Sequence, residues 1–405
     1  MRKAPYADFS LGEYRDRLSR LRKAMDERKV DGMFLTTREA IEFVSGFETI
    51  AMTYPFKQFA VVVPRDRDPI LVIDVLHIPN AANTSWVDNV KVWGEKGTTH
   101  MDGLVDAITE AGLAGKTVGS ELGPETRLNM TILDYEALKR RLPKMKVVDG
   151  SDITRKIRMV KSPEELARIR KACEITCESF GAAFEKLRQG MTERAFLNSV
   201  EMEMLERDAD CGYNRVEAVI HVCTGPDRKG QYAAVPVDRK IAKGDFVRID
   251  GCAQYKHYVC DMTRSFYFDT EVDSAKKKRM NALVKAQQAI PKVARPGVTS
   301  DELVNTVLEV FKNEGVADQI VRWVTPRQGA KYIIGHNFGF VIHEEPDIYE
   351  GGKDVWRENM VFACELILGE YEEENDYLVT KNGCELLTPL EHKASFKQGE
   401  PWKIG

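Results

Sequence analysis

A pair of aspartates, eleven residues apart, frames a predicted hairpin in the second half of this 405-residue chain. Asp250 ends an apolar run that begins at Phe246, and Asp261 precedes the run Met-Thr-Arg-Ser-Phe-Tyr-Phe, which ends in three aromatic residues. Asp is poorly suited to strand interiors, and a buried carboxylate needs a partner because an unpaired buried charge is costly. Two turn aspartates are one interpretation, and two buried carboxylates that belong to a site are the other.

Two of the seven histidines, His336 and His343, lie seven residues apart in apolar sequence that is punctuated by glycine. Gly335 and Gly339 allow the backbone to approach closely around His336. A single histidine in such a setting is more often a core residue whose hydrogen bonds are satisfied. Two histidines with this flanking sequence favour a functional site.

Two glutamates complete the set. Glu365 lies inside an otherwise apolar strand, where an edge carboxylate that points to water is the alternative. Glu374 follows two other glutamates, and this run alone would suggest a solvated acidic turn. In chain order the segments offer Asp, Asp, His, Glu and Glu, which suits two divalent ions bridged by carboxylates and sharing an activated water. A single zinc ion would need fewer oxygen ligands.

The elements that would position these residues are those of a mixed α/β chain. An amphipathic helix is predicted over 13–29. Ser162, Pro163 and Glu165 form a strong helix start, and that helix is predicted to reach Gly190. The segments 190–193 and 297–300 each end one helix and begin another, which is weak evidence for two related halves. The other expected elements are strands at 33–35, 59–63, 70–73, 117–120 and 146–148 and helices near 101–112 and 131–141.

Length and composition exclude several classes of protein. A chain of 405 residues suggests two or three domains. The composition, with 43% hydrophobic and 30% charged residues, predicts a globular protein. The net charge of −4 gives no indication of a nucleic-acid or membrane partner. The N-terminus lacks the apolar stretch of a secretory signal. The eight cysteines, Cys211 among them, form no CxxC pair, so we expect reduced thiols and a cytoplasmic location.

The order and spacing of these motifs resemble the pita-bread metallopeptidases, which include methionine aminopeptidase, aminopeptidase P, prolidase and creatinase. The resemblance covers roughly 155–392, and it is carried by Asp261-Met-Thr-Arg, by His343-Glu-Glu-Pro and by Glu374-Asn. The region before it resembles a creatinase-type N-terminal domain more loosely. The resemblance implies an α/β (α+β) chain with a creatinase-like N-terminal domain over 1–155 and a pita-bread catalytic domain over 156–405.

By this resemblance, two divalent ions are expected, Mn in the first place with Co or Fe as alternatives. Glu365 would also take the proton from the attacking water, and His343 would stabilise the oxyanion or shuttle a proton. Thr263 would hold a ligand carboxylate. Substrate contacts are expected at Tyr232, Tyr258 and His343. The implied metal ligands are Asp250, Asp261, His336, Glu365 and Glu374.

The sequence also departs from the family pattern. Proline peptidases usually carry a histidine about seventeen residues before the first metal aspartate, where this chain has Ala233, and an arginine where it has Glu372. Glu365 also lacks the proline that normally follows it. These departures predict that Xaa-Pro cleavage is weak or absent and that the natural substrate is a small molecule. The acidic residues Glu372 and Glu373 would favour a cationic substrate if they face the pocket.

The leading hypothesis is a metal-dependent hydrolase of the Xaa-Pro aminopeptidase or prolidase type, acting on a small peptide or peptide-like amide. A non-peptidase member acting on a small cationic molecule is the alternative, either a creatinase-like C–N hydrolase or a dimethylsulfoniopropionate-cleaving lyase. The second alternative is a pseudo-enzyme that binds a ligand without catalysis. A homodimer is expected, because relatives with this N-terminal domain commonly close each other's pockets.

Overall fold

The computed structural model describes residues 4–124, 126–210, 219–322 and 332–405, so Cys211 lies outside the described residues. The chain forms two compact units, Met1–Arg158 and Met159–Gly405. None of the described helices is long and apolar enough to cross a membrane.

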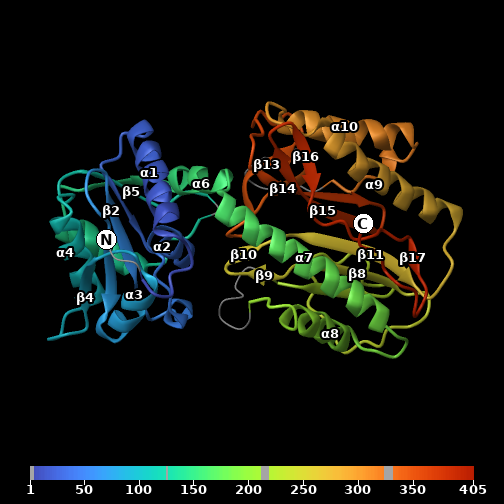
Figure 1. The fold of residues 1–405 in the computed structure, drawn as a ribbon, viewed down its shortest axis with the longest axis horizontal. Helices are drawn as coiled ribbons and strands as arrows, with labels where there is room; N and C mark the ends of the chain where they lie inside the picture. The colour runs from blue at the N-terminus through green and yellow to red at the C-terminus, as the bar shows by residue number, and fades with distance from the viewer. Residues whose placement is uncertain (1–3, 125, 211–218, 323–331) are drawn as a thin grey trace. The chain divides into compact units, whose positions relative to one another are not determined.

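The first unit is built on a six-stranded mixed sheet with the strand order β4-β3-β2-β1-β5-β6 (Figure 1). The central strands are buried along their whole length, and α4 packs on the sheet over β2, β3 and β4. The strands are β1 (Gly32–Leu35), β2 (Ala60–Pro64), β3 (Ile70–Asp74), β4 (Asn89–Trp93), β5 (Thr117–Ser120) and β6 (Lys146–Asp149). The helices are α1 (Leu11–Glu27), α2 (Arg38–Ser45), α3 (Ile78–Thr84), α4 (His100–Glu110), α5 (Ile132–Arg141) and α6 (Ser151–Met159).

The second unit contains two antiparallel-rich sheets, each covered by a pair of helices (Figure 1). In the four-stranded sheet, β17-β11-β8-β7, the strands pack against α7 (Pro163–Lys186) and α8 (Glu193–Leu205). Its strands are β7 (His221–Thr224), β8 (Phe246–Gly251), β11 (Met262–Phe268) and β17 (Ser395–Phe396), and a short hairpin of β9 (Gln254–Tyr255) and β10 (Tyr258–Val259) connects β8 to β11.

The five-stranded sheet has the order β13-β12-β14-β15-β16 and packs against α9 (Ser274–Val293) and α10 (Ser300–Asn313). Strands β11 and β15 bring the two sheets together. This contact positions the residues of β8 and β11 opposite those of β15. The strands are β12 (Ile333–Asn337), β13 (Glu344–Tyr349), β14 (Val361–Leu368), β15 (Tyr371–Thr380) and β16 (Gly383–Leu386).

The two halves of the second unit repeat one local arrangement. Gly190 (φ 86°) and Gly297 (φ 98°) adopt the left-handed conformation that glycine tolerates. Two residues later Thr192 and Thr299 cap the next helix through their side chains. Each threonine also forms an isolated bridge to a later strand-like segment. The repeated four-residue signal therefore corresponds to a repeated helix–turn–helix.

Element boundaries differ from the predictions in a few places. The first helix is Leu11–Glu27 rather than 13–29. The helix that begins at Pro163 ends at Lys186, before the predicted Gly190, because Leu187 is already extended with ψ of 129°. Its start agrees with the prediction, since the side chains and backbones of Ser162 and Glu165 form a reciprocal capping box.

Candidate metal centre

Asp250 and Asp261 come from the two strands at the middle of the four-stranded sheet. Strands β8 and β11 are antiparallel with Asp250 opposite Thr263, and Asp261 immediately precedes β11. Asp261 is buried (5% exposed), whereas the Asp250 side chain keeps 26% of its surface exposed. The β9–β10 hairpin therefore returns the chain so that both carboxylates lie at one end of the sheet.

Glu374 belongs to a row of three carboxylates on one face of β15. Glu372, Glu374 and Asp376 alternate along the strand and are 2%, 2% and 0% exposed. The interpretation of this run as a solvated acidic turn is therefore wrong. Glu365 lies directly opposite Glu374 on β14. Because β14 is flanked by β12 and β15, the edge-strand interpretation of Glu365 is wrong as well.

His336 reaches the same place from β12. Its Nε2 atom lies 3.6 Å from Asp261 Oδ2, and its side chain is buried. A Cβ at Gly335 would lie 1.9 Å from the carbonyl oxygen of Ala363 on β14, so only glycine allows this approach of the two strands. The ring of His343 stacks on that of His336 with centroids 3.9 Å apart, and His343 is exposed.

These side chains form two groups that share one member. Ligand atoms of Asp250, Asp261 and Glu374 all lie within 4.8 Å of one another, and so do those of Asp261, His336 and His343. Glu365 lies next to them, since its carboxylate interacts electrostatically with those of Glu374 and Asp250. The structure thus brings together all five side chains that the sequence suggested as metal ligands.

The electrostatics of this cluster are those of a cation site. Burial, followed by the charge of Asp250, raises the pKa of Asp261 well above its usual value. Burial and the neighbouring Glu374 raise the pKa of Glu365 to about 8. Among the described residues, Glu374 Oε1 has no hydrogen-bond partner although it is buried. Crowded, desolvated carboxylates with an imidazole are a donor set that fits divalent ions, which would offset the mutual repulsion.

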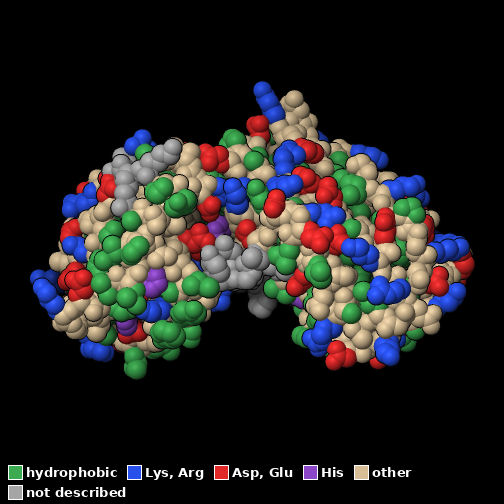
Figure 2. Space-filling view, turned by 60° about the horizontal axis from the view of Figure 1, so that its bottom comes forward, with side chains coloured by type: hydrophobic (Ala, Val, Ile, Leu, Met, Phe, Trp, Pro, Cys, Tyr) green, Lys and Arg blue, Asp and Glu red, His purple; other side chains and the backbone are tan. Residues whose placement is uncertain are grey.

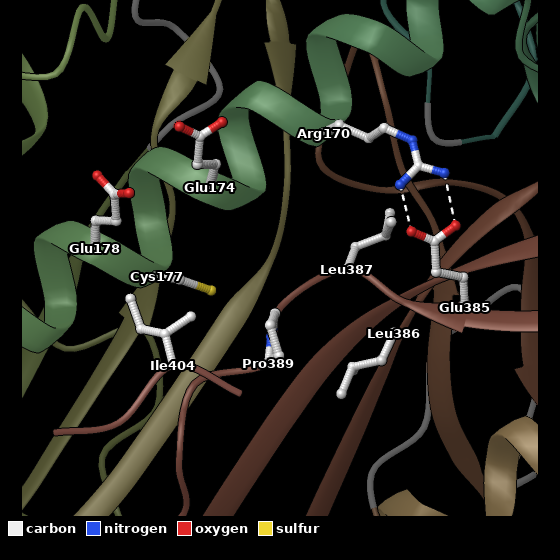
Figure 3. A pocket seen from close by; sticks show the side chains of 9 residues that line it. All are labelled: Arg170, Glu174, Cys177, Glu178, Glu385, Leu386, Leu387, Pro389 and Ile404. Carbon is white, nitrogen blue, oxygen red and sulfur yellow. Dashed lines mark hydrogen bonds and ion pairs between the residues drawn. The ribbon is translucent and has the colours of Figure 1, made fainter.

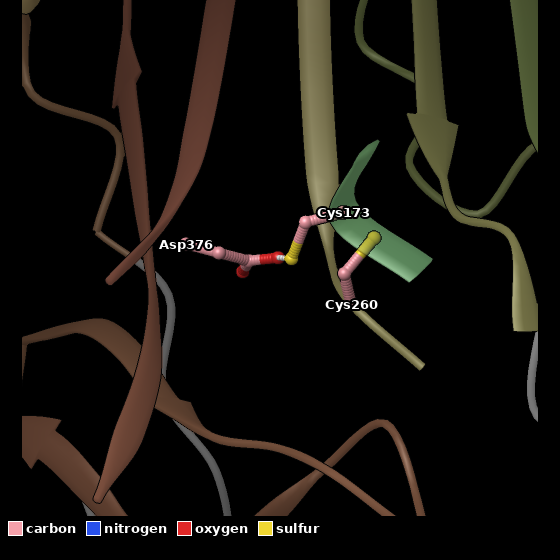
Figure 4. A group of neighbouring side chains, drawn as sticks. All are labelled: Cys173, Cys260 and Asp376. Atoms are coloured by element: carbon pink, nitrogen blue, oxygen red, sulfur yellow. Dashed lines mark hydrogen bonds between the residues drawn. The ribbon is translucent and has the colours of Figure 1, made fainter. Parts of the chain in front are cut away.

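Neighbouring groups hold the carboxylates in place. Thr263 Oγ1 donates a hydrogen bond to Glu374 Oε2 at 3.1 Å, as expected of this threonine. Asp376 Oδ2 accepts from the backbone N–H of Asp261 at 2.8 Å and from the Cys173 thiol at 3.6 Å (Figure 4). Burial raises the pKa of Cys173 to about 12, so this thiol stays protonated and acts as a donor. Asp376 therefore fixes the backbone at the residue that the two groups share.

Two residues near the cluster were missed by the sequence analysis. Arg248 Nη1 lies 2.8 Å from Glu372 Oε2, and the two side chains are 3% and 2% exposed. His221 Nδ1 lies 3.4 Å from Asp250 Oδ2, and this hydrogen bond raises the pKa of the imidazole. The alternation of β8 places Arg248 on the same face as Asp250, which is the one signal that could have identified it.

The charge argument for a cationic substrate needs correction. Glu372 is buried and paired with Arg248. Glu373 is buried too, and its Oε2 atom lies 2.6 Å from His392 Nδ1. Neither carboxylate presents uncompensated negative charge to a substrate, because each already has a partner. The reason for preferring a cationic substrate is thereby lost.

The predicted substrate-contact tyrosines differ in their surroundings. Tyr258 is 0% exposed, and its hydroxyl donates to Glu165 Oε1 at 2.7 Å, so its ring offers no surface to a substrate and its prediction as a contact is wrong. Tyr232 is 43% exposed and its ring lies 4.2 Å from the Arg248 guanidinium. Its phenol also interacts with the charges of Glu372 and Glu365, which places it beside the carboxylate cluster.

A separate pocket lies between α7 and the end of the chain (Figure 3). Arg170 and Glu385 form an ion pair across it, with Arg170 Nη2 2.6 Å from Glu385 Oε2. None of the predicted site residues lines this pocket, so it is distinct from the carboxylate cluster. Its lining is Arg170, Glu174, Cys177, Glu178, Glu385, Leu386, Leu387, Pro389 and Ile404.

Comparisons with known proteins agree with this geometry. An Xaa-Pro dipeptidase of Pyrococcus furiosus is 26% identical over 384 residues, which cover 94% of this chain and 99% of that relative. A solved prolidase structure from Pyrococcus furiosus, also 26% identical, superposes with a TM-score of 0.73 and covers 92% of this chain and 100% of that one. A solved Xaa-Pro dipeptidase from Bacillus anthracis gives a TM-score of 0.79 at 22% identity, covers 94% and 99% of the two chains, and shows the common fold.

Two family matches divide the chain between them. Residues 17–160 match the Creatinase/Prolidase N-terminal domain. Residues 167–383 match the Metallopeptidase family M24, which is more than half of the 405 residues. The chain therefore belongs to metallopeptidase family M24, a family of metal-dependent hydrolases, and carries a creatinase/prolidase-type N-terminal domain ahead of its pita-bread domain.

Proposed function

We propose that this chain is a dinuclear metallopeptidase that hydrolyses Xaa-Pro dipeptides or closely related small amides. The observation that carries the proposal is the pair of side-chain groups that share Asp261. In addition, the buried Oε1 atom of Glu374 has no hydrogen-bond partner among the described residues. The similarity to Xaa-Pro dipeptidases over nearly the whole chain supports the substrate class. The proposed metal ligands are Asp250, Asp261, His336, Glu365 and Glu374.

The proposed roles follow from exposure and position. Two bound divalent ions would polarise the scissile carbonyl and make a shared water acidic enough to attack. Glu365, which lies beside Glu374 and Asp250, would accept the proton from the attacking water. His343, exposed and stacked on His336, would stabilise the oxyanion or pass a proton to the leaving nitrogen. Tyr232 offers an exposed ring to the substrate.

The identity of the metal, the assembly and the location belong to the same proposal. Oxygen-rich ligands favour Mn²⁺, with Co²⁺ or Fe²⁺ as alternatives, over Zn²⁺.

Exposed apolar side chains on the N-terminal unit support a homodimer, because such surface favours association (Figure 2). They include Tyr54 (42% exposed), Phe56 (73%) and Leu76 (72%). Light scattering at micromolar concentration should give twice the chain mass of 45.9 kDa. A cytoplasmic location agrees with the absence of disulfides among the described cysteines, which are buried except for the half-buried Cys384.

The test is hydrolysis of Gly-Pro and Ala-Pro by Mn²⁺-loaded protein, with creatine as the non-peptide competitor. We expect cleavage of the dipeptides, and loss of about 10²–10⁴-fold in kcat for Glu365→Gln, which removes the base. Glu358→Gln, at an exposed position, is the matched control. Protein that holds two ions per chain but turns over creatine and neither dipeptide would overturn the proposal.

A further inference from the structure

The strongest unassigned feature of the site is the arginine on β8 two residues before Asp250. Arg248 is buried, and it has contacts in two directions. On one side its Nη1 atom lies 2.8 Å from Glu372 Oε2. On the other its guanidinium lies 4.2 Å from the ring of Tyr232, and its Nη2 donates to the carbonyl oxygen of Gln231.

Each direction leads to a residue with a proposed role. Glu372 lies on the same face of β15 as Glu374, which is opposite Glu365 on β14. The carboxyl groups of Glu372 and Glu365 interact, so Arg248 reaches the proposed base through one intermediary. Tyr232 is the exposed aromatic residue beside the same carboxylates. Its segment, residues 226–238, is largely exposed. Arg248 contacts both this segment and Glu372.

We propose that Arg248 is a positioning residue that fixes the base Glu365, through Glu372, and the substrate-contacting Tyr232 at the same time. This inference rests on the proposed function of the site and extends it to a residue that touches no substrate.

The chemistry of arginine suits this double task. Its planar guanidinium has several N–H donors in fixed directions and a face that packs on aromatic rings, which lysine lacks. The positive charge offsets the negative charge of Glu372, so that this carboxylate can lie against Glu365. The second nitrogen and the flat face remain for Gln231 and Tyr232. Loss of Arg248 should therefore disturb the base and the substrate contact together.

The experiment separates the two directions by kinetics on Gly-Pro. Tyr232→Ala should raise KM about tenfold with little change in kcat, and Glu372→Gln should lower kcat about tenfold with little change in KM, the range for loss of a supporting partner. Arg248→Met should both raise KM and lower kcat. Arg248→Lys keeps the charge and loses the flat fork, so it should raise KM and leave kcat nearly unchanged. Arg295→Met, an exposed position, is the control.

A second readout needs no substrate. The segment held by Arg248 contains the trypsin sites Arg228 and Lys229. Arg248→Met and Arg248→Lys should speed tryptic cleavage there severalfold, and Glu372→Gln should not. Absence of Gly-Pro hydrolysis in Mn²⁺-loaded wild type would refute the proposed function alone, and the trypsin rates would still decide this inference. Unchanged cleavage in both Arg248 variants, or an Arg248→Met variant with only one kinetic parameter altered, would overturn it.

Discussion

Replacement of Thr263 by valine tests how much one hydrogen bond contributes to the proposed metal site. Thr263 is 0% exposed, and its Oγ1 donates to Glu374 Oε2 at 3.1 Å. This is the one hydrogen bond that the Glu374 carboxylate accepts from the described residues, because Oε1 has none. Valine has nearly the same shape as threonine, so Thr263→Val removes the donor without opening a cavity.

The magnitude follows from the charge of the acceptor. A hydrogen bond to a charged group contributes about 1.5–3 kcal/mol, which corresponds to roughly 10- to 150-fold in an equilibrium constant. We expect Thr263→Val to raise the Kd for Mn²⁺ by about 10–100-fold, the range seen when a partner of a metal ligand is removed. Thr263→Ser keeps the hydroxyl and should bind Mn²⁺ almost as the wild type does.

The assay is competition for Mn²⁺ with a fluorescent chelator, and urea unfolding of the metal-free proteins shows whether each variant is folded. Wild-type affinity in Thr263→Val would refute the reasoning, because Glu374 would then need no donor. An equal loss in Thr263→Ser would refute it too, since the effect would come from packing and not from the hydroxyl.

Three further predictions concern the strands, the core and the pH dependence of stability. Gly335→Ala should abolish Mn²⁺ binding and lower the melting temperature in calorimetry, because the new Cβ would lie 1.9 Å from Ala363 O; normal binding would show that β12 can shift. Arg264→Lys should lower the free energy of unfolding in urea by about 1–3 kcal/mol for each carbonyl that loses its donor, since the buried guanidinium donates to the backbone carbonyls of Thr263, Glu374 and Leu390. A total loss below about 1 kcal/mol would contradict this, because it would correspond to no more than one ordinary hydrogen bond. In the metal-free folded chain Glu365 keeps its proton up to about pH 8, whereas the unfolded chain releases it near the usual pKa of 4.5. The free energy of unfolding should therefore fall as pH rises from about 4.5 to about 8, and Glu365→Gln should reduce this pH dependence. An identical pH dependence in the variant would show that another group titrates.

Local signals in the sequence predicted the elements that depend on local physics. The helix start at Ser162 follows from capping, and the close approach at Gly335 follows from the absence of a Cβ. The helices α2, α3 and α6 and the edge strand β4 were not predicted, because segments of eight, seven, nine and five residues are too short for periodicity to separate them from loops. Strand β4 forms by pairing with β3, and α2 packs on β2 and α1, so both depend on tertiary contacts.

The ion pairs of the site are the part that sequence could not supply. Arg248 and Glu372 are 124 residues apart, and they meet only because β11 and β15 bring two sheets together. A run of three glutamates has the composition of a solvated turn, so burial on β15 is a tertiary effect. Glu372, which stands where proline peptidases usually have arginine, therefore pairs with Arg248 in a way that no local sequence pattern indicated.

The most direct test of the two-ion site is anomalous diffraction from crystals of the Mn²⁺-loaded protein, collected at the manganese absorption edge. We expect two anomalous peaks per chain, both within bonding distance of Asp261 or Glu374, with His336 and Glu365 completing the shell. A single peak, or two peaks away from these side chains, would show that Asp250, Asp261, His336, Glu365 and Glu374 do not form a dinuclear metal site.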